Sequence, residues 1–80
     1  MIGAEQMRAA RGLIGWSQSR LAEASGLAVS TIKRMEGTDS TLKSSVENVL
    51  KVQRALEDAG VVFTDQGDDR GPGVRLKDPI

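Results

Sequence analysis

Three polar or basic side chains, Ser30, Lys33 and Arg34, are spaced so that they fall together on one side of a short predicted helix. At 100° per residue, Ile32 and Met35 fall on the opposite, inward side of that helix. An arginine guanidinium makes two parallel hydrogen bonds to the edge of a guanine, and a serine hydroxyl donates or accepts one. A cationic, hydrogen-bonding face on a short helix is therefore typical of a rod that enters the DNA major groove.

The elements that must position this face lie between Ser17 and Gly37, a stretch that reads as two short helices joined by a tight turn. Ser17 is the predicted N-cap of the first helix, because its hydroxyl can accept from a free backbone N–H. Gly26 is its predicted end, since glycine reaches the left-handed conformation at little cost. The second helix is predicted from about Val29 to Glu36.

This stretch carries a recognisable pattern, SQ-x-x-LA-x-x-x-GL-x-x-x-TI-x-R-x-EG. The pattern closely resembles the xenobiotic-response-element family of helix-turn-helix regulators, which also includes the phage repressors and Cro. The resemblance covers about residues 2–60 and implies a mainly α fold, a four-helix repressor-like domain that binds double-stranded DNA sequence-specifically. One departure is Ala28, where many members carry Ser or Thr as the N-cap of the second helix. That change costs about 1 kcal/mol of helix stability.

The candidate DNA contacts follow from the helix face and the resemblance together. The expected base contacts in the major groove are Ala28, Val29, Ser30, Lys33 and Arg34. The resemblance also places Gln18 on a phosphate, at a helix N-terminus that attracts anions. In the polar loop after the second helix, Thr38 and Lys43 either touch phosphates or are simply solvated. The alternative for the whole set is an ordinary solvated helix face.

The resemblance implies one structural ion pair. In the family, the arginine at the position of Arg11 forms a largely buried pair with the glutamate at the position of Glu36. Such a pair would tie a first helix, predicted over residues 2–13, to the recognition helix. The alternative is a solvated arginine on a helix surface. Burying the pair gains little stability, but removing one partner costs about 3 kcal/mol because a charge is stranded.

The second half of the chain predicts a longer helix and then a β-hairpin. Ser44 and Glu47 have capping-box spacing, and the helix they open should run to about Ala59 and stop at Gly60. Strands are predicted over residues 61–64 and 74–77, joined by a loop dense in Gly, Asp and Pro. We expect Phe63, Val74 and Leu76 to face the long helix.

The C-terminal segment, residues 61–80, is also the predicted dimerisation element, distinct from the helix-turn-helix domain of residues 1–60. A two-stranded hairpin has open edges, and the run Val61-Val62-Phe63 is apolar on both faces. Pairing with a second copy would satisfy the edge and cover Val62. The alternative is a monomer whose hairpin caps its own long helix. The residues assigned to dimerisation are Val61, Val62, Phe63, Val74 and Leu76.

Composition limits the remaining possibilities. The 80 residues make one small domain without cysteine or histidine, so we expect no disulfide, no metal, no cofactor and no enzymatic activity. Net charge is zero, yet residues 1–37 carry a surplus of +2, so the positive charge lies with the motif. No apolar run is long enough for a membrane span or a signal peptide, and we expect a soluble, cytoplasmic protein.

The expected function is therefore transcriptional regulation, with repression as the expected mode, by a homodimer on an inverted repeat. A second hypothesis is an antitoxin or phage-type partner protein whose main role is to bind another protein. The near-neutral charge and the apolar hairpin are compatible with that hypothesis. An adjacent gene for a small toxin, or co-purification of one, would distinguish the two.

Overall fold

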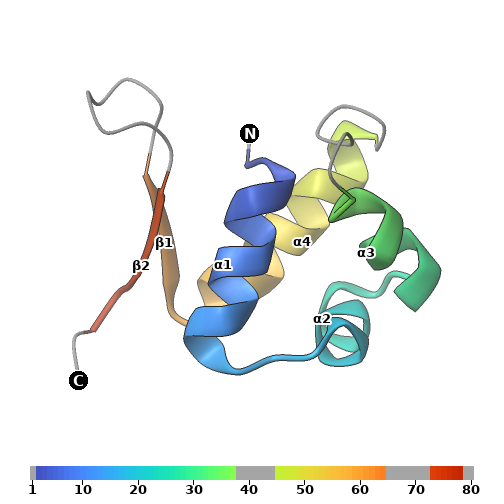
Figure 1. Cartoon of the computed structure of the whole chain (residues 1–80). Coiled ribbons are helices and arrows are strands. Elements are labelled where there is room, and N and C mark those ends of the chain that lie inside the picture. Colours follow the sequence, from blue (N-terminus) through green and yellow to red (C-terminus); the bar gives the residue numbers. More distant parts are fainter. Residues whose placement is uncertain (1, 38–44, 65–72, 79–80) are drawn as a thin grey trace.

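The computed structural model describes residues 2–37, 45–64 and 73–78, and it contains four helices and a β-hairpin within them (Figure 1). The elements are α1 (Ala4–Ile14), α2 (Gln18–Ser25), α3 (Val29–Met35), α4 (Val46–Asp58), β1 (Val61–Thr64) and β2 (Gly73–Leu76). The predicted mainly α fold with a C-terminal hairpin is confirmed. None of the helices in these ranges is long and apolar enough to cross a lipid bilayer.

Helix ends in the first half of the chain follow from local chemistry. The Ser17 hydroxyl accepts from the backbone N–H of Arg20 at 3.0 Å, as the predicted N-cap of α2. Gly26 ends α2 in the left-handed conformation at φ 75°, which only glycine adopts without a steric cost. Ala28 stands at the N-cap of α3 and contributes no side-chain hydrogen bond.

Helix α4 begins one residue later than predicted. Its N-cap is Ser45, whose hydroxyl accepts from the backbone N–H of Asn48 at 3.2 Å. Ser44, the predicted cap, lies outside the described residues. The predicted stop is confirmed, because Gly60 follows α4 with φ 103° and redirects the chain into β1.

The hydrophobic core is shared by all four helices and the hairpin. Figure 1 places α2 and α3 on one side of the α1–α4 pair and the hairpin on the other side. The largest side chains that are fully buried are those of Leu21, Ile32, Leu56 and Val52. Val61 is 2% exposed, and Phe63 and Val74 pack against the same core. The hairpin therefore belongs to the same hydrophobic core as residues 1–60.

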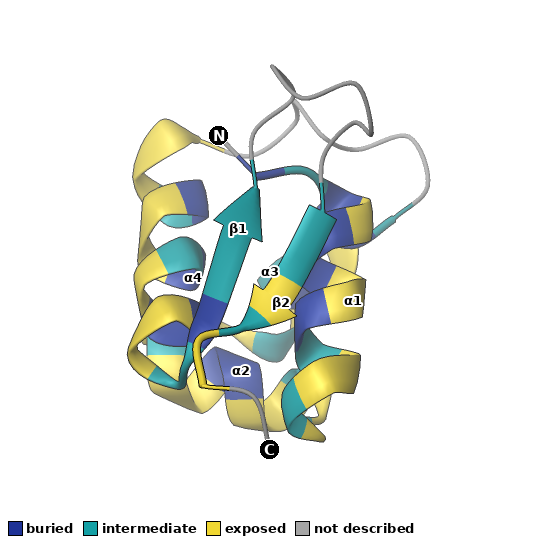
Figure 2. Ribbon diagram, turned by 90° about the vertical axis from the view of Figure 1, so that its left-hand side faces the viewer, coloured by how far each residue is buried: buried dark blue, intermediate teal, exposed yellow. Residues whose placement is uncertain are grey.

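The hairpin covers α1 as well as α4, which differs from the prediction. Strand β1 packs against both helices, whereas β2, with Val74 and Leu76, lies mainly along α1 (Figure 2). The sequence had placed both residues against the long helix, the element that directly precedes the hairpin. The apolar side of α1 takes part of the hairpin because α1 and α4 lie next to each other beneath it.

Candidate nucleic-acid interface

Helix α3 has a fully buried side and an open side. Ile32 is 0% and Met35 3% exposed, so the inward face is as predicted. Ser30, Lys33 and Arg34 are exposed together on the outward side. Lys33 and Arg34 have no side-chain hydrogen bond or ion pair with any residue in the described parts of the chain. Their cationic ends are therefore available to an external acceptor.

The N-terminal end of α3 is less uniform than its outward face. Ala28 is exposed, which leaves its methyl group available for an apolar contact. Val29 is half-buried and packs against the core, so only part of its side chain reaches the surface. Of the predicted base-contacting residues, Ser30, Lys33 and Arg34 share the outward side of α3, whereas Ala28 is exposed at its N-cap and Val29 is half-buried.

The C-terminal end of α3 is held by the predicted ion pair between Arg11 and Glu36. The guanidinium of Arg11 donates two hydrogen bonds to the two carboxylate oxygens of Glu36, from Nε at 2.7 Å and from Nη2 at 2.8 Å. The Glu36 side chain is 2% and the Arg11 side chain 20% exposed. This two-pronged geometry is the strongest form of a carboxylate–arginine contact. The predicted pairing is confirmed, and it joins α1 to the end of α3.

Further groups complete the surroundings of this pair. Arg11 also donates from Nη1 to the backbone carbonyl of Trp16 at 2.9 Å, and Gln18 Nε2 donates to Glu36 Oε1 at 3.1 Å. Hydrogen bonding to Glu36 raises the pKa of the Arg11 guanidinium, burial opposes the rise, and the charge of Glu36 adds to it. Because an arginine already titrates far above neutral pH, Arg11 stays charged at physiological pH.

Arg8 is a residue that the sequence analysis did not assign to the site. Its guanidinium donates to the backbone carbonyl of Glu36, the C-cap residue of α3. A cation at this position complements the negative end of the helix dipole and satisfies a carbonyl that has no partner within the helix. Arg8 and Arg11 lie almost one turn apart on α1, so their side chains share one side of that helix. This spacing was the feature of the sequence that could have indicated a role for Arg8 beside Glu36. Together they fix α3 at its C-terminal end.

Gln18 has a structural role beside its predicted role at a phosphate. It is half-buried, and one of its two amide N–H groups is directed to Glu36. One N–H and the start of α2 remain for an external anion. The other predicted phosphate contacts, Thr38 and Lys43, lie outside the described residues.

Trp16 and Arg20 form a second surface feature beside α2. The guanidinium carbon of Arg20 lies 4.7 Å from the centre of the Trp16 ring, and the same side chain forms an ion pair with Glu23 at 2.9 Å. Trp16 is half-buried and packs against the core. Arg20 is thus occupied on the protein surface, in contrast to Lys33 and Arg34.

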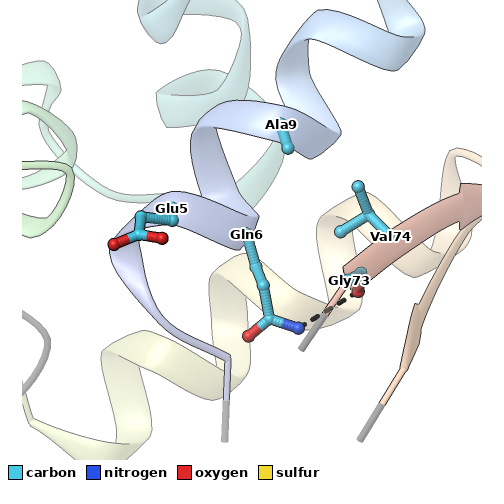
Figure 3. A pocket seen from close by; sticks show the side chains of 5 residues that line it. All are labelled: Glu5, Gln6, Ala9, Gly73 and Val74. Atoms are coloured by element: carbon cyan, nitrogen blue, oxygen red, sulfur yellow. Dashed lines mark hydrogen bonds between the residues drawn. The ribbon is translucent and has the colours of Figure 1, made fainter. Parts of the chain in front are cut away.

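A shallow pocket of about 180 Å³ lies between α1 and β2, away from α3 (Figure 3). Gln6 lines it and is 9% exposed; its amide donates to the carbonyls of Gly73 at 3.2 Å and Thr64 at 3.4 Å. Its oxygen accepts from the N–H of Gly3 at 3.0 Å. The amide N–H groups of Gln6 therefore join α1 to the hairpin, and its oxygen caps the start of α1.

No cluster of three or more metal-ligating side chains exists among the residues that the structure describes. Comparison of the chain with models of known protein families and with curated proteins finds no match.

Proposed function

We propose that this chain is a sequence-specific DNA-binding regulator of transcription, with α3 as the helix that enters the major groove. The observation that carries the proposal is the exposed face of Ser30, Lys33 and Arg34 on a helix whose other face is buried. Cationic side chains without partners contribute little to the fold. Their availability is what recognition of phosphates and base edges requires.

The proposed DNA contacts are of two kinds, contacts of α3 with base edges and a contact of α2 with a phosphate. Arg34 supplies a guanidinium for the N7 and O6 acceptors of guanine, and Ser30 supplies a hydroxyl. The methyl group of Ala28 suits a thymine methyl. Gln18 contributes an amide N–H to a phosphate beside the start of α2. The first three side chains would select sequence, and Gln18 would set the position of the domain on the duplex.

The rigid attachment of α3 supports the same function. Side chains that read base edges must be held within a fraction of an ångström of the bound geometry. The Arg11–Glu36 pair and the bond from Arg8 fix the C-terminal end of α3 relative to α1. Ile32 and Met35 fix its inner face in the core. The remaining freedom is that of the exposed side chains themselves.

The test is selection of bound duplexes from a random pool of double-stranded oligonucleotides, followed by sequencing. We expect enrichment of a motif with two-fold symmetry, because regulators of this kind act as two-fold pairs. Binding of the enriched duplex should fall steeply with salt, as phosphate contacts require. A pool that remains unenriched after several rounds would overturn the proposal.

A matched pair of variants tests whether α3 is the part of the chain that binds the selected duplex. Lys33→Ala removes a positive charge from the proposed interface, and Lys51→Ala removes one from an exposed position of α4. We expect the first to weaken binding of the selected duplex and the second to leave it nearly unchanged. Equal effects of both would mean that only net charge matters.

A further inference from the structure

Arg8 is an exposed residue of α1 whose guanidinium is held at one corner. Its Nη1 donates to the backbone carbonyl of Glu36, the C-cap residue of α3. The edge of a guanidinium that is formed by Nε and Nη2 matches two oxygens of one carboxylate or phosphate. In Arg8 this edge has no hydrogen bond or ion pair with any residue that the structure describes. The side chain is thus fixed in place while its anion-binding edge stays open.

Arg11, almost one turn further along the same helix, shows the contrast. Its Nε and Nη2 both donate to the carboxylate of Glu36, and its Nη1 donates to the carbonyl of Trp16. The Arg11 side chain is only 20% exposed, so little of it reaches solvent. Arg8 reaches the same end of α3 but uses only Nη1 there. Of the two arginines, Arg8 is therefore the one that can bind an external anion.

The bond to Glu36 places the Arg8 guanidinium at the C-terminal end of α3. Glu36 keeps helical backbone angles, and the carbonyls of a helix point toward its C-terminus. At 100° per residue, Lys33 lies about 60° around the helix from Glu36, closer than any other residue of the exposed face. Arg8 therefore extends the exposed cationic face of α3 past the end of the helix, on the side of Lys33.

Gln18 brings the start of α2 to the same residue. Its amide donates to the Glu36 carboxylate at 3.1 Å, whereas Arg8 binds the carbonyl of that residue. Arg11 balances the charge of the carboxylate. The charge of Arg8 is not balanced in this way, because Glu5, almost one turn earlier on α1, forms no ion pair with it. An amide and an uncompensated cation from two different helices therefore meet around one residue.

We propose that the free edge of Arg8 binds a phosphate of the DNA backbone while Nη1 remains on the carbonyl of Glu36. The inference deepens the proposed function and rests on it. Nε and Nη2 each donate to one phosphate oxygen, in the two-pronged geometry that arginine forms with this anion. Because Nη1 already holds the guanidinium in place, binding costs less side-chain freedom than it does at an unattached arginine.

The same side chain then joins α3 to the DNA backbone. One corner holds the carbonyl at the end of the helix and the other edge holds a phosphate. The guanidinium thus fixes how far the C-terminal end of α3 stands from that strand. Phosphate contacts of this kind position a protein on the duplex and carry no sequence information directly. Arg8 is in this role a positioning residue for the side chains of α3 that contact bases.

The experiment scans single phosphates of the duplex that the wild-type chain selects. In a set of otherwise identical duplexes, each phosphate near the motif is replaced in turn by an uncharged methylphosphonate. The affinity of each duplex is measured for the wild type, Arg8→Gln and Arg54→Gln. Arg54 is the matched control, because it is an exposed arginine on another helix, α4.

With the unmodified duplex, Arg8→Gln should bind about tenfold more weakly, because a charge-assisted contact is lost. The slope of log K against log salt concentration should become shallower by about 0.9, as the loss of one phosphate contact requires. One methylphosphonate position that weakens binding by the wild type should have little further effect on this variant. Arg54→Gln should match the wild type in all three measurements.

The position-specific effect separates a phosphate contact from a purely structural role. Loss of the cap on α3 alone would weaken binding of every duplex and leave the sensitivity to each phosphate unchanged. If no methylphosphonate position loses its effect in Arg8→Gln, the proposal is overturned and Arg8 only caps α3.

Arg8→Lys keeps the experiment decisive if thermal unfolding shows that the glutamine variant is not folded. Lysine retains the positive charge but has no planar edge for two parallel bonds. The salt slope should therefore stay that of the wild type, while the effect of neutralising the critical phosphate becomes smaller. An effect as large as in the wild type at every position would overturn the proposal.

The proposed function and this inference fail in different ways. A wild-type chain that selects no duplex would refute both, since there is then no DNA for Arg8 to bind. Selection of a duplex whose phosphates are equally sensitive in the wild type and in folded Arg8→Gln would refute the Arg8 contact alone.

Discussion

Two groups of charged side chains meet on α3, and they differ in almost every physical respect. At its C-terminal end, Arg11 and Glu36 are paired through two hydrogen bonds and largely withdrawn from water. Along its outer face, Lys33 and Arg34 are exposed and have no partner within the described residues. An arginine thus holds the helix in one place and is free to interact in another.

The difference shows that burial and pairing, and not the presence of charge, decide what a basic residue does. A buried carboxylate without its cation is costly, so the first group should affect folding. An exposed lysine or arginine contributes little to stability, so the second group should affect binding alone. Substitutions can separate these two effects.

The largest effect is expected at the buried pair. Arg11→Met or Glu36→Gln should each lower the free energy of unfolding by about 3–5 kcal/mol, because the remaining partner is left buried without compensation. The double variant should lose less than the sum of the two. Chemical denaturation of all three variants provides the measurement, and strict additivity would contradict the coupling.

Arg34→Ala should separate binding from folding. We expect a loss of about 1–3 kcal/mol on the selected duplex, with relaxed preference at one base position. The free energy of unfolding should change by less than about 0.5 kcal/mol, since the side chain is exposed. Affinity measured across a panel of singly substituted duplexes tests the prediction; a uniform loss at every position would mean that Arg34 contacts only phosphate.

Gln18→Ala should affect both stability and binding, because the residue bonds to the buried Glu36 and is also a proposed phosphate contact. It removes one hydrogen bond from the Glu36 carboxylate, with an expected cost of about 1.5 kcal/mol in stability. It also removes the proposed phosphate contact, so all duplexes should be bound more weakly by a similar factor. Parallel unfolding and binding titrations give the two numbers, and an unchanged stability would place the amide away from Glu36 in solution.

Ala28→Ser should stabilise the domain by about 1 kcal/mol. The backbone at this N-cap is extended, with φ −72° and ψ 149°, as a capping serine requires, and no side chain now caps the helix. Ala24→Ser is a suitable control, because the same change at an exposed position inside α2 should destabilise by a few tenths of a kcal/mol. Equal melting temperatures for the two variants would argue against capping at residue 28.

The smallest effect is expected at the exposed ion pair of α2. Glu23→Gln removes the negative charge from the ion pair with Arg20. The side chains of Arg20 and Glu23 are 49% and 77% exposed, so the loss of the pair should cost less than about 0.5 kcal/mol. The contrast with Glu36→Gln isolates burial as the cause of the difference. A loss at Glu23 as large as that at Glu36 would invalidate the comparison.

The sequence predicted those features that depend on neighbouring residues or on the family resemblance. Ser17 and Gly26 define α2 through local backbone chemistry, and both were assigned correctly. The pairing of Arg11 with Glu36 followed from the resemblance to the xenobiotic-response-element regulators. For α4, two consecutive serines offered nearly equivalent caps, so local chemistry alone did not choose Ser45 over Ser44.

Features that depend on distant packing were not predicted. Gln6 reaches Thr64 and Gly73 across 58 and 67 residues of chain, and nothing around Gln6 identifies those carbonyls. The position of β2 along α1 was missed for the same reason. Gln18 was assigned to a phosphate because the resemblance places the residue at this position on the DNA backbone. Its bond to Glu36 instead arises from how α2 and α3 pack.

The hydrogen bond from Gln6 to Gly73 also affects when the newly synthesised chain can complete its fold. Helix α1 leaves the ribosome long before β2 is synthesised. Until then, the side-chain amide of Gln6 stays hydrated, and the side of α1 that packs on the hairpin is exposed to solvent. The domain can therefore close only after α2, α3 and α4 have all emerged. A product truncated before Gly73 would still contain the whole of α3, yet we expect it to be too unstable to compete for an operator and to be removed by proteolysis. For the DNA-binding function proposed above, the requirement for β2 would keep incomplete copies off the operator.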